Sequence, residues 1–173
     1  NLKISHTIDL LNLQKGIIHK STGNIDLAAR IFSTIVAKPD SPGILDTKAE
    51  ALYQIGTIEM AHNRNNLALN YFNRALDLNA KNKNLEQKAN ILLALSTVHK
   101  KMLDKNNAYT YLKQHTNLKE SISLLDNEKL GVDDYEKFKE TERLEEIARI
   151  NKENIQKEKT SKFSKLISIL AIA

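Results

Sequence analysis

A spacing of small and bulky residues recurs along this chain with a period of 40 residues. Each copy has one small residue, a second small residue twelve positions later and a bulky residue four positions after that. The three copies are Gly16, Ala28 and Phe32; Gly56, Ala68 and Phe72; Ser96, Ala108 and Leu112. A fixed period in this range is typical of solenoids, in which stacked helix pairs bury the apolar stripe that one pair leaves uncovered. We therefore expect an all-α chain whose default function is recognition of another protein.

Each residue of this spacing has an expected packing role. The small residue on the first helix lets the second helix approach, and the small residue on the second helix fits against it. The bulky residue lies one turn further along the same helix face and fills the layer between pairs. The predicted repeat-packing residues are Gly16, Ala28, Phe32, Gly56, Ala68, Phe72, Ala75, Ser96, Ala108 and Leu112.

The segment from Ala49 to Ala80 resembles the tetratricopeptide repeat. Six residues match the core positions of that repeat: Leu52, Ile55, Gly56, Ala68, Phe72 and Ala75. The flanking copies match less well, since Lys15 and His115 stand where the repeat has apolar or small residues. The resemblance implies a superhelix of about three helix pairs over residues 1–125, followed by a long C-terminal helix.

The resemblance also implies where a partner binds. In tetratricopeptide repeats the first helices of successive pairs line a concave groove that holds a protein or peptide. The residues at those places are Leu13, Ile17, Lys20, Tyr53, Thr57, Met60, Leu93, Thr97, Lys100 and Lys101. Apolar residues toward one end and lysines toward the other suit a peptide with an acidic end. The alternative is that three repeats form little groove and that these side chains are solvated or packed on the C-terminal helix.

The composition excludes several kinds of chemistry. The chain has no Cys, which excludes thiol catalysis and cysteine zinc sites, and none of its five His lies three or four residues from another. It contains no Gly-x-Gly to hold a phosphate. The net charge of +5 comes from scattered basic residues, and only 5% of residues are aromatic, so we expect no nucleic-acid partner. We expect no catalytic residue, metal or cofactor in these residues.

The chain changes character after about Leu125. Residues 126–165 hold eleven acidic and ten basic residues, no Pro and a single Gly, Gly131. Apolar residues are reduced to a broken stripe, which predicts a connector helix over residues 126–162. This helix is either a weak coiled coil or a single solvated helix, and the sequence leaves both readings open.

The last residues, 163–173, are mostly apolar. A membrane-spanning helix needs about 20 apolar residues, and this run reaches the final residue given. We expect residues 163–173 to begin a truncated transmembrane helix. The alternative is an amphipathic segment that packs back on the repeats.

The order of repeats, charged helix and membrane span resembles sensor histidine kinases of the Bacteroidetes type, closely over residues 111–173 and less closely before them. The resemblance implies a recognition segment of a two-component signalling protein whose kinase core is absent from these residues. None of the five His stands in the phosphoacceptor box of such kinases, so the segment itself is expected not to be an enzyme. Two alternatives remain open: a free-standing adaptor, and the sensor region of a helix-turn-helix transcription regulator.

The same resemblance implies a homodimeric parent protein in the bacterial inner membrane. The C-terminal apolar segment would enter the membrane, and the repeats would lie in the periplasm. Four lysines just before the apolar run argue for the opposite orientation, because basic flanks usually stay inside: Lys157, Lys159, Lys162 and Lys165.

Overall fold

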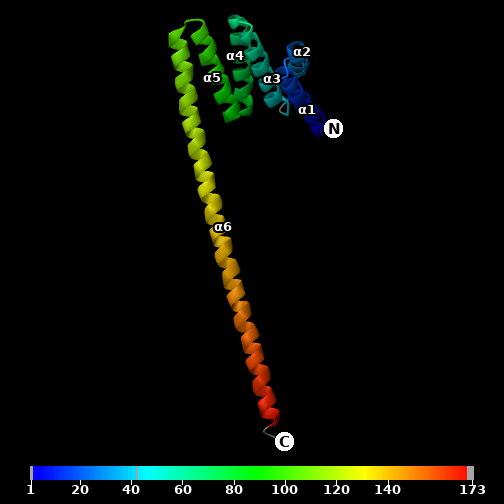
Figure 1. Ribbon diagram of the computed structural model, residues 1–173, viewed down its shortest axis with the longest axis vertical. Coiled ribbons are helices and arrows are strands. Elements are labelled where there is room, and N and C mark those ends of the chain that lie inside the picture. The colour runs from blue at the N-terminus through cyan, green and yellow to red at the C-terminus, as the bar shows by residue number, and fades with distance from the viewer. Residues whose placement is uncertain (1, 42, 171–173) are drawn as a thin grey trace. The chain divides into compact units, whose positions relative to one another are not determined.

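The computed structural model describes residues 2–41 and 43–170, with side chains described for residues 6–41 and 43–162. Every regular element in this part of the chain is an α-helix (Figure 1). The helices are α1 (Leu2–Ser21), α2 (Ile25–Val36), α3 (Leu45–Ala61), α4 (Asn65–Asn82), α5 (Leu85–Lys101) and α6 (Lys105–Leu170). The predicted all-α fold, with helix pairs followed by a long C-terminal helix, is confirmed.

The chain divides into two compact units, Asn1–Ser123 and Leu124–Ala173. The first unit holds α1 to α5 and the beginning of α6, and the second holds the rest of α6. The predicted domain limits at residues 125, 162 and 173 stay predictions.

Two glycines allow the helices of the first two pairs to cross closely. A Cβ atom added to Gly16 would lie 2.5 Å from Phe32 Cε1, and one added to Gly56 would lie 2.6 Å from Phe72 Cε1. Real Cβ atoms do not approach other atoms so closely, so only glycine fits these crossings without movement of the phenylalanine ring. Both rings are fully buried.

The third pair packs differently. Ser96 Oγ donates a hydrogen bond to the backbone oxygen of Ala108, at 2.7 Å. Leu112 is 44% exposed, whereas Phe32 and Phe72 at the equivalent positions are buried. The expected layer-filling role of Leu112 is therefore wrong. The physical reason is its place in the last pair, since no further helix pair stacks on it in the described part of Asn1–Ser123.

The core consists of two clusters, and each cluster joins one helix pair to the first helix of the next pair. The first cluster is Leu13, Ala28, Phe32, Ile35, Ala51, Ile55 and Ile58. The second is Leu52, Ala68, Phe72, Ala75, Ile91, Ala94, Leu95 and Val98. Each pair thus depends on its neighbour to bury its apolar face, as expected of a solenoid.

The turn inside each helix pair repeats the same backbone conformation. Gly23, Asn63 and Leu103, which stand 40 residues apart, have φ angles of 83°, 59° and 62°. A residue in the left-handed conformation ends a helix and lets the chain change direction. Gly and Asn adopt this conformation at low energetic cost. Leu103 adopts it with its side chain 83% exposed.

Helix α6 is continuous from Lys105 to Leu170. Its first turns form the second helix of the third pair, and they run without a break into the charged segment after Leu125. The side chain of Asp104 caps its start, since Asp104 Oδ1 accepts a hydrogen bond from the backbone N–H of Asn107 at 3.2 Å. Gly131 does not interrupt the helix.

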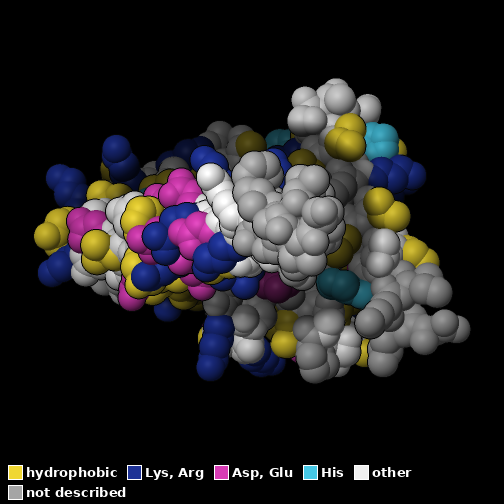
Figure 2. All heavy atoms as spheres, turned by 90° about the horizontal axis from the view of Figure 1, so that it is seen from below, with side chains coloured by type: hydrophobic (Ala, Val, Ile, Leu, Met, Phe, Trp, Pro, Cys, Tyr) yellow, Lys and Arg dark blue, Asp and Glu magenta, His cyan; other side chains and the backbone are white. Residues whose placement is uncertain are grey.

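Side chains along the second unit are exposed through residue 162. Acidic, basic and hydrophobic side chains are intermixed on the face of the molecule that Figure 2 shows. Ion pairs one turn apart include Arg143 with Glu140 at 3.0 Å and Arg149 with Glu146 at 2.8 Å. Exposed pairs of this kind contribute little to the stability of a helix, because solvent screens their charges.

Among the residues that the structure describes, no helix combines the length and the apolar character needed to cross a membrane. The side chains of the predicted transmembrane segment, residues 163–173, lie outside the described residues.

Candidate recognition face

Helices α1, α3 and α5 are neighbours in the first unit, because α3 contacts both of the others. We call the surface that they form the first-helix face. All ten predicted partner-binding residues lie on these three helices, but their side chains are not equally available to a partner.

Lys20 joins α1 to α3. Its Nζ donates to Gln54 Oε1 at 2.6 Å and to Thr57 Oγ1 at 2.5 Å. Burial lowers the pKa of the Lys20 ammonium, and the nearby carboxylate of Glu50 partly offsets this. We expected Lys20 to be a free cation for an acidic ligand, but two of its three ammonium donors already bind within the fold.

The polar contacts continue from α3 to α5. Gln54 Nε2 donates to Glu50 Oε1 at 2.7 Å, and Gln87 Nε2 lies 3.5 Å from Glu50 Oε2. Gln87 Nε2 also donates to the backbone oxygen of Asp46 at 3.1 Å. Lys20, Gln54, Glu50 and Gln87 therefore form a polar chain across the first-helix face. The sequence analysis missed the last three, although the four-residue spacing of Glu50 and Gln54 places them on one side of the predicted helix.

Apolar members of the predicted set lie partly in the core. Leu13 is only 5% exposed and belongs to the first core cluster, so its expected role in binding a partner is wrong. Ile17 packs partly against the same cluster. Tyr53 is half-buried, with its ring centroid 5.8 Å from that of Phe72. Burial, and secondly the charge of Glu50, raises the pKa of the Tyr53 hydroxyl.

The accessible part of the predicted set lies toward α5. Leu93 is 42% exposed, and Lys100 and Lys101 are exposed as well. Lys101 Nζ donates to the backbone oxygen of Met60 at 3.1 Å, which ties α5 to the end of α3. Thr97 Oγ1 donates to the backbone oxygen of Leu93 at 2.8 Å. Leu93, Lys100 and Lys101 thus form an apolar and basic surface that a partner can reach.

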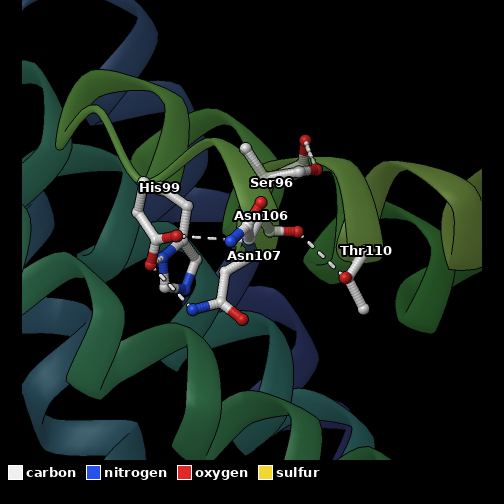
Figure 3. A network of polar contacts seen from close by, with 7 residues as sticks. Ser96, His99, Asn106, Asn107 and Thr110 are labelled. Atoms are coloured by element: carbon white, nitrogen blue, oxygen red, sulfur yellow. Dashed lines mark hydrogen bonds and ion pairs between the residues drawn. The ribbon is translucent and has the colours of Figure 1, made fainter.

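The junction between α5 and α6 is held by a compact polar network (Figure 3). His99 Nδ1 lies 3.1 Å from Asp104 Oδ2, and Asn107 Nδ2 donates to the same oxygen at 2.7 Å. Hydrogen bonds from Asn107, and secondly the contact with His99, lower the pKa of the Asp104 carboxyl. The His99 ring stacks on Tyr111, with ring centroids 5.4 Å apart. These contacts fix the start of α6 to the end of α5.

No group of three potential metal-ligating side chains occurs in the described part of the chain. The first-helix face is built from helix surfaces joined by side-chain hydrogen bonds.

A comparison with family models matches residues 49–82 to the tetratricopeptide repeat. The matched residues cover most of α3 and all of α4, the pair in which Gly56 meets Phe72. No curated protein and no solved structure matches the chain. Tetratricopeptide repeats are non-catalytic modules that bind proteins or peptides. The predicted tetratricopeptide repeat is confirmed over residues 49–82, and a repeat of this kind suggests recognition of a protein or peptide.

Proposed function

We propose that this chain is the recognition segment of a membrane-bound sensor histidine kinase. A partner binds the first-helix face, and α6 passes the resulting change toward a membrane span and a kinase core. The observation that supports this proposal is the continuity of α6. The first turns of α6 pack on α5, and the same helix continues through the charged segment to Leu170. A shift of α5 could therefore be transmitted along α6.

The partner is proposed to be an acidic protein or peptide with an apolar anchor. Residues 1–125 hold 16 basic and 10 acidic residues, so the repeats attract acidic molecules at long range. Leu93 offers an exposed apolar contact on α5, and Lys100 and Lys101 follow two turns later on the same helix. This chemistry suits a helical or extended segment whose acidic end meets the lysines.

The remaining parts of the proposal concern the parent protein. We propose that it is a homodimer in the bacterial inner membrane, with the repeats in the periplasm and residues 163–173 entering the bilayer. A reporter fusion after Lys165 in the parent gene tests the orientation. Alkaline phosphatase activity is expected, and a silent fusion would place the repeats on the cytoplasmic side.

A free-standing adaptor is the second candidate function, and the apolar residues of α6 favour it. Tyr135 and Phe138 are exposed, as are Leu144 and Ile147. Six residues separate Phe138 from Leu144, a rotation of about 600° that places the second pair on a different side of the helix. One straight parallel seam between two copies of α6 cannot bury both pairs. Two separate apolar surfaces suit a scaffold that holds more than one protein.

The recognition step can be tested with peptides selected by display against the intact chain. Binding of the selected peptide should weaken at least about tenfold on Leu93→Asp and on Lys100→Glu, since each removes an accessible contact. Leu67→Asp is the matched control, because Leu67 is also exposed but lies on α4. Equal loss of binding in all three variants, or in none, would contradict the proposed face.

The kinase step can be tested with the full product of the gene in membrane vesicles. Labelled ATP should transfer its γ-phosphate to a histidine outside residues 1–173. A product that ends without a kinase core would favour the adaptor, and a basic helix-turn-helix domain would favour a transcription regulator. The gene sequence that follows the codon for Ala173 shows which of these domains, if any, the protein carries.

A further inference from the structure

A cleft of about 240 Å³ lies among α2, α3, α4 and the loop that precedes α3. Its apolar lining is Val36 of α2, Leu52 of α3 and Leu78 of α4. None of the ten predicted partner-binding residues lines it. The volume is smaller than the roughly 300 Å³ at which pockets for drug-sized molecules begin, so the cleft suits a smaller ligand.

The wall of this cleft contains a buried lysine. The Lys48 side chain is only 9% exposed, and its Nζ donates to Asp40 Oδ1 at 2.5 Å and to the backbone oxygen of Lys38 at 2.6 Å. An ammonium group has three donors, and these two contacts use two of them. Lys48 lies in the first turns of α3, where the helix dipole disfavours a positive charge. Burial and the helix dipole therefore both make the charged form of Lys48 less favourable in the folded protein.

Two further charges line the cleft without ion partners. Arg74 and Asp77 lie three residues apart on α4, yet neither takes part in a salt bridge among the described residues. A basic residue followed three positions later by an acidic one does give a pair on α6, between Lys139 and Glu142 at 3.4 Å. The Arg74 guanidinium instead lies over the ring of Tyr71, 5.6 Å from its centroid. One cation and one anion thus remain available to a ligand.

The 40-residue period shows that the packing of helix pairs does not need these charges. At the next junction Ala80 takes the place of Asp40, Gln114 that of Arg74 and Asn117 that of Asp77, whereas Lys88 keeps the lysine of position 48. The helices stack at both junctions. Since neutral residues stand at the positions of Arg74 and Asp77 in the next junction, stacking does not require these two exposed charges, and both can meet a ligand.

We propose that this cleft binds a small zwitterion, namely a free α-amino acid with a small aliphatic side chain. Its carboxylate is held by Arg74, the better of the two cations for a planar anion, with Lys48 nearby. Its ammonium group is held by Asp77. Its side chain lies against Val36, Leu52 and Leu78. The site is distinct from the first-helix face, so it stands or falls independently of the function proposed above.

Calorimetric titration of the intact chain with L-valine tests the proposal. We expect saturable binding at one site per chain. Valinamide lacks the carboxylate and 3-methylbutanoate lacks the ammonium group, and each should bind at least about tenfold more weakly, as expected for the loss of one charged hydrogen bond. No saturable binding of L-alanine, L-valine or L-leucine would overturn the proposal. Equal binding of valinamide and L-valine would also overturn it.

Two variants locate the site on the chain. Arg74→Gln and Asp77→Asn install the residues that the next junction carries at the same repeat position, so both should fold with unchanged helical content. Each should weaken L-valine binding at least about tenfold. Arg149→Gln, on the exposed part of α6, is the control and should bind normally. Binding that is equal in all four proteins would show that the cleft is not the site.

Discussion

Gly56 of α3 lies directly against the ring of Phe72 of α4, so that a Cβ atom on Gly56 would stand 2.6 Å from Phe72 Cε1. This contact closes the second helix pair and lies in the residues that match the tetratricopeptide repeat. The Phe72 ring is fully buried and belongs to the second core cluster, so moving it would disturb the packing of that cluster.

The first prediction follows from that contact. Gly56→Leu should lower the free energy of unfolding by about 3 kcal/mol, because a large side chain must displace a packed ring. Urea denaturation measures the change. Gly131→Leu is the matched control, since nothing lies within 4 Å of a Cβ atom there. It should raise helical content by removing a glycine from a helix interior. A Gly56→Leu protein as stable as wild type would show that the helices do not cross as described.

The second prediction concerns the turn between α5 and α6. Leu103→Asn should raise the free energy of unfolding by about 0.5–1 kcal/mol, since Leu103 has a φ of 62° and Asn tolerates this region better. Asn63 already holds the equivalent place in the second pair. Leu124→Asn, at an exposed position inside α6, should give no such gain. Thermal melting that shows a loss for Leu103→Asn would contradict the left-handed turn.

The third prediction concerns a buried amide. Asn79 is 1% exposed, and its Nδ2 donates to the backbone oxygen of Asn84 at 2.8 Å and to Gln87 Oε1 at 3.1 Å. Asn79→Ala should lower the free energy of unfolding by about 1–3 kcal/mol, because the backbone oxygen of Asn84 and Gln87 Oε1 each lose a hydrogen bond from Asn79. Asn90→Ala, at an exposed position on α5, should change stability little. Equal effects of the two substitutions, measured by urea denaturation, would rule out this network.

The fourth prediction is a pH dependence at the start of α6. The folded-state pKa of Asp104 lies below its unfolded value of about 3.9, so its ionised form stabilises the fold above that value. This contribution is lost as the pH falls through the lowered pKa. Asp104→Asn should therefore be less stable than wild type at pH 7, and the difference should vanish in strong acid. A difference that is constant with pH would mean that the Asp104 charge has no role.

The fold was predictable where sterics leave few choices. A small residue is needed wherever two helices cross closely, so the spacing of Gly16, Gly56 and Ser96 marked the helix pairs. The continuity of α6 was harder to predict, because composition changes after Leu125 while nothing there stops a helix: the segment has no Pro, and Gly131 stands alone. A change from apolar to charged composition indicates that a helix passes from a packed to a solvent-exposed environment. The helix itself need not end there.

The candidate face was predicted only in outline. The helices that form it follow from the repeat, but repeat position does not say which side chains turn toward the core. Leu13 is buried against the first core cluster for this reason. The polar chain through Glu50 and Gln87 could not be predicted from the repeat. Hydrogen bonds between helices depend on the distance between the helix axes, and the period of the sequence does not give that distance.

The central claim is that α6 carries the state of the repeats to an output domain. Two residues inserted after Asn151 rotate the following part of the helix by about 200°, whereas seven residues rotate it by about 700°, which returns it to within about 20° of its original direction. Phosphorylation of the proposed parent kinase should be measured in cells for both insertions. The account predicts that two residues change kinase output and that seven residues leave it near normal. Output unchanged by both insertions would contradict the account and make α6 a passive spacer.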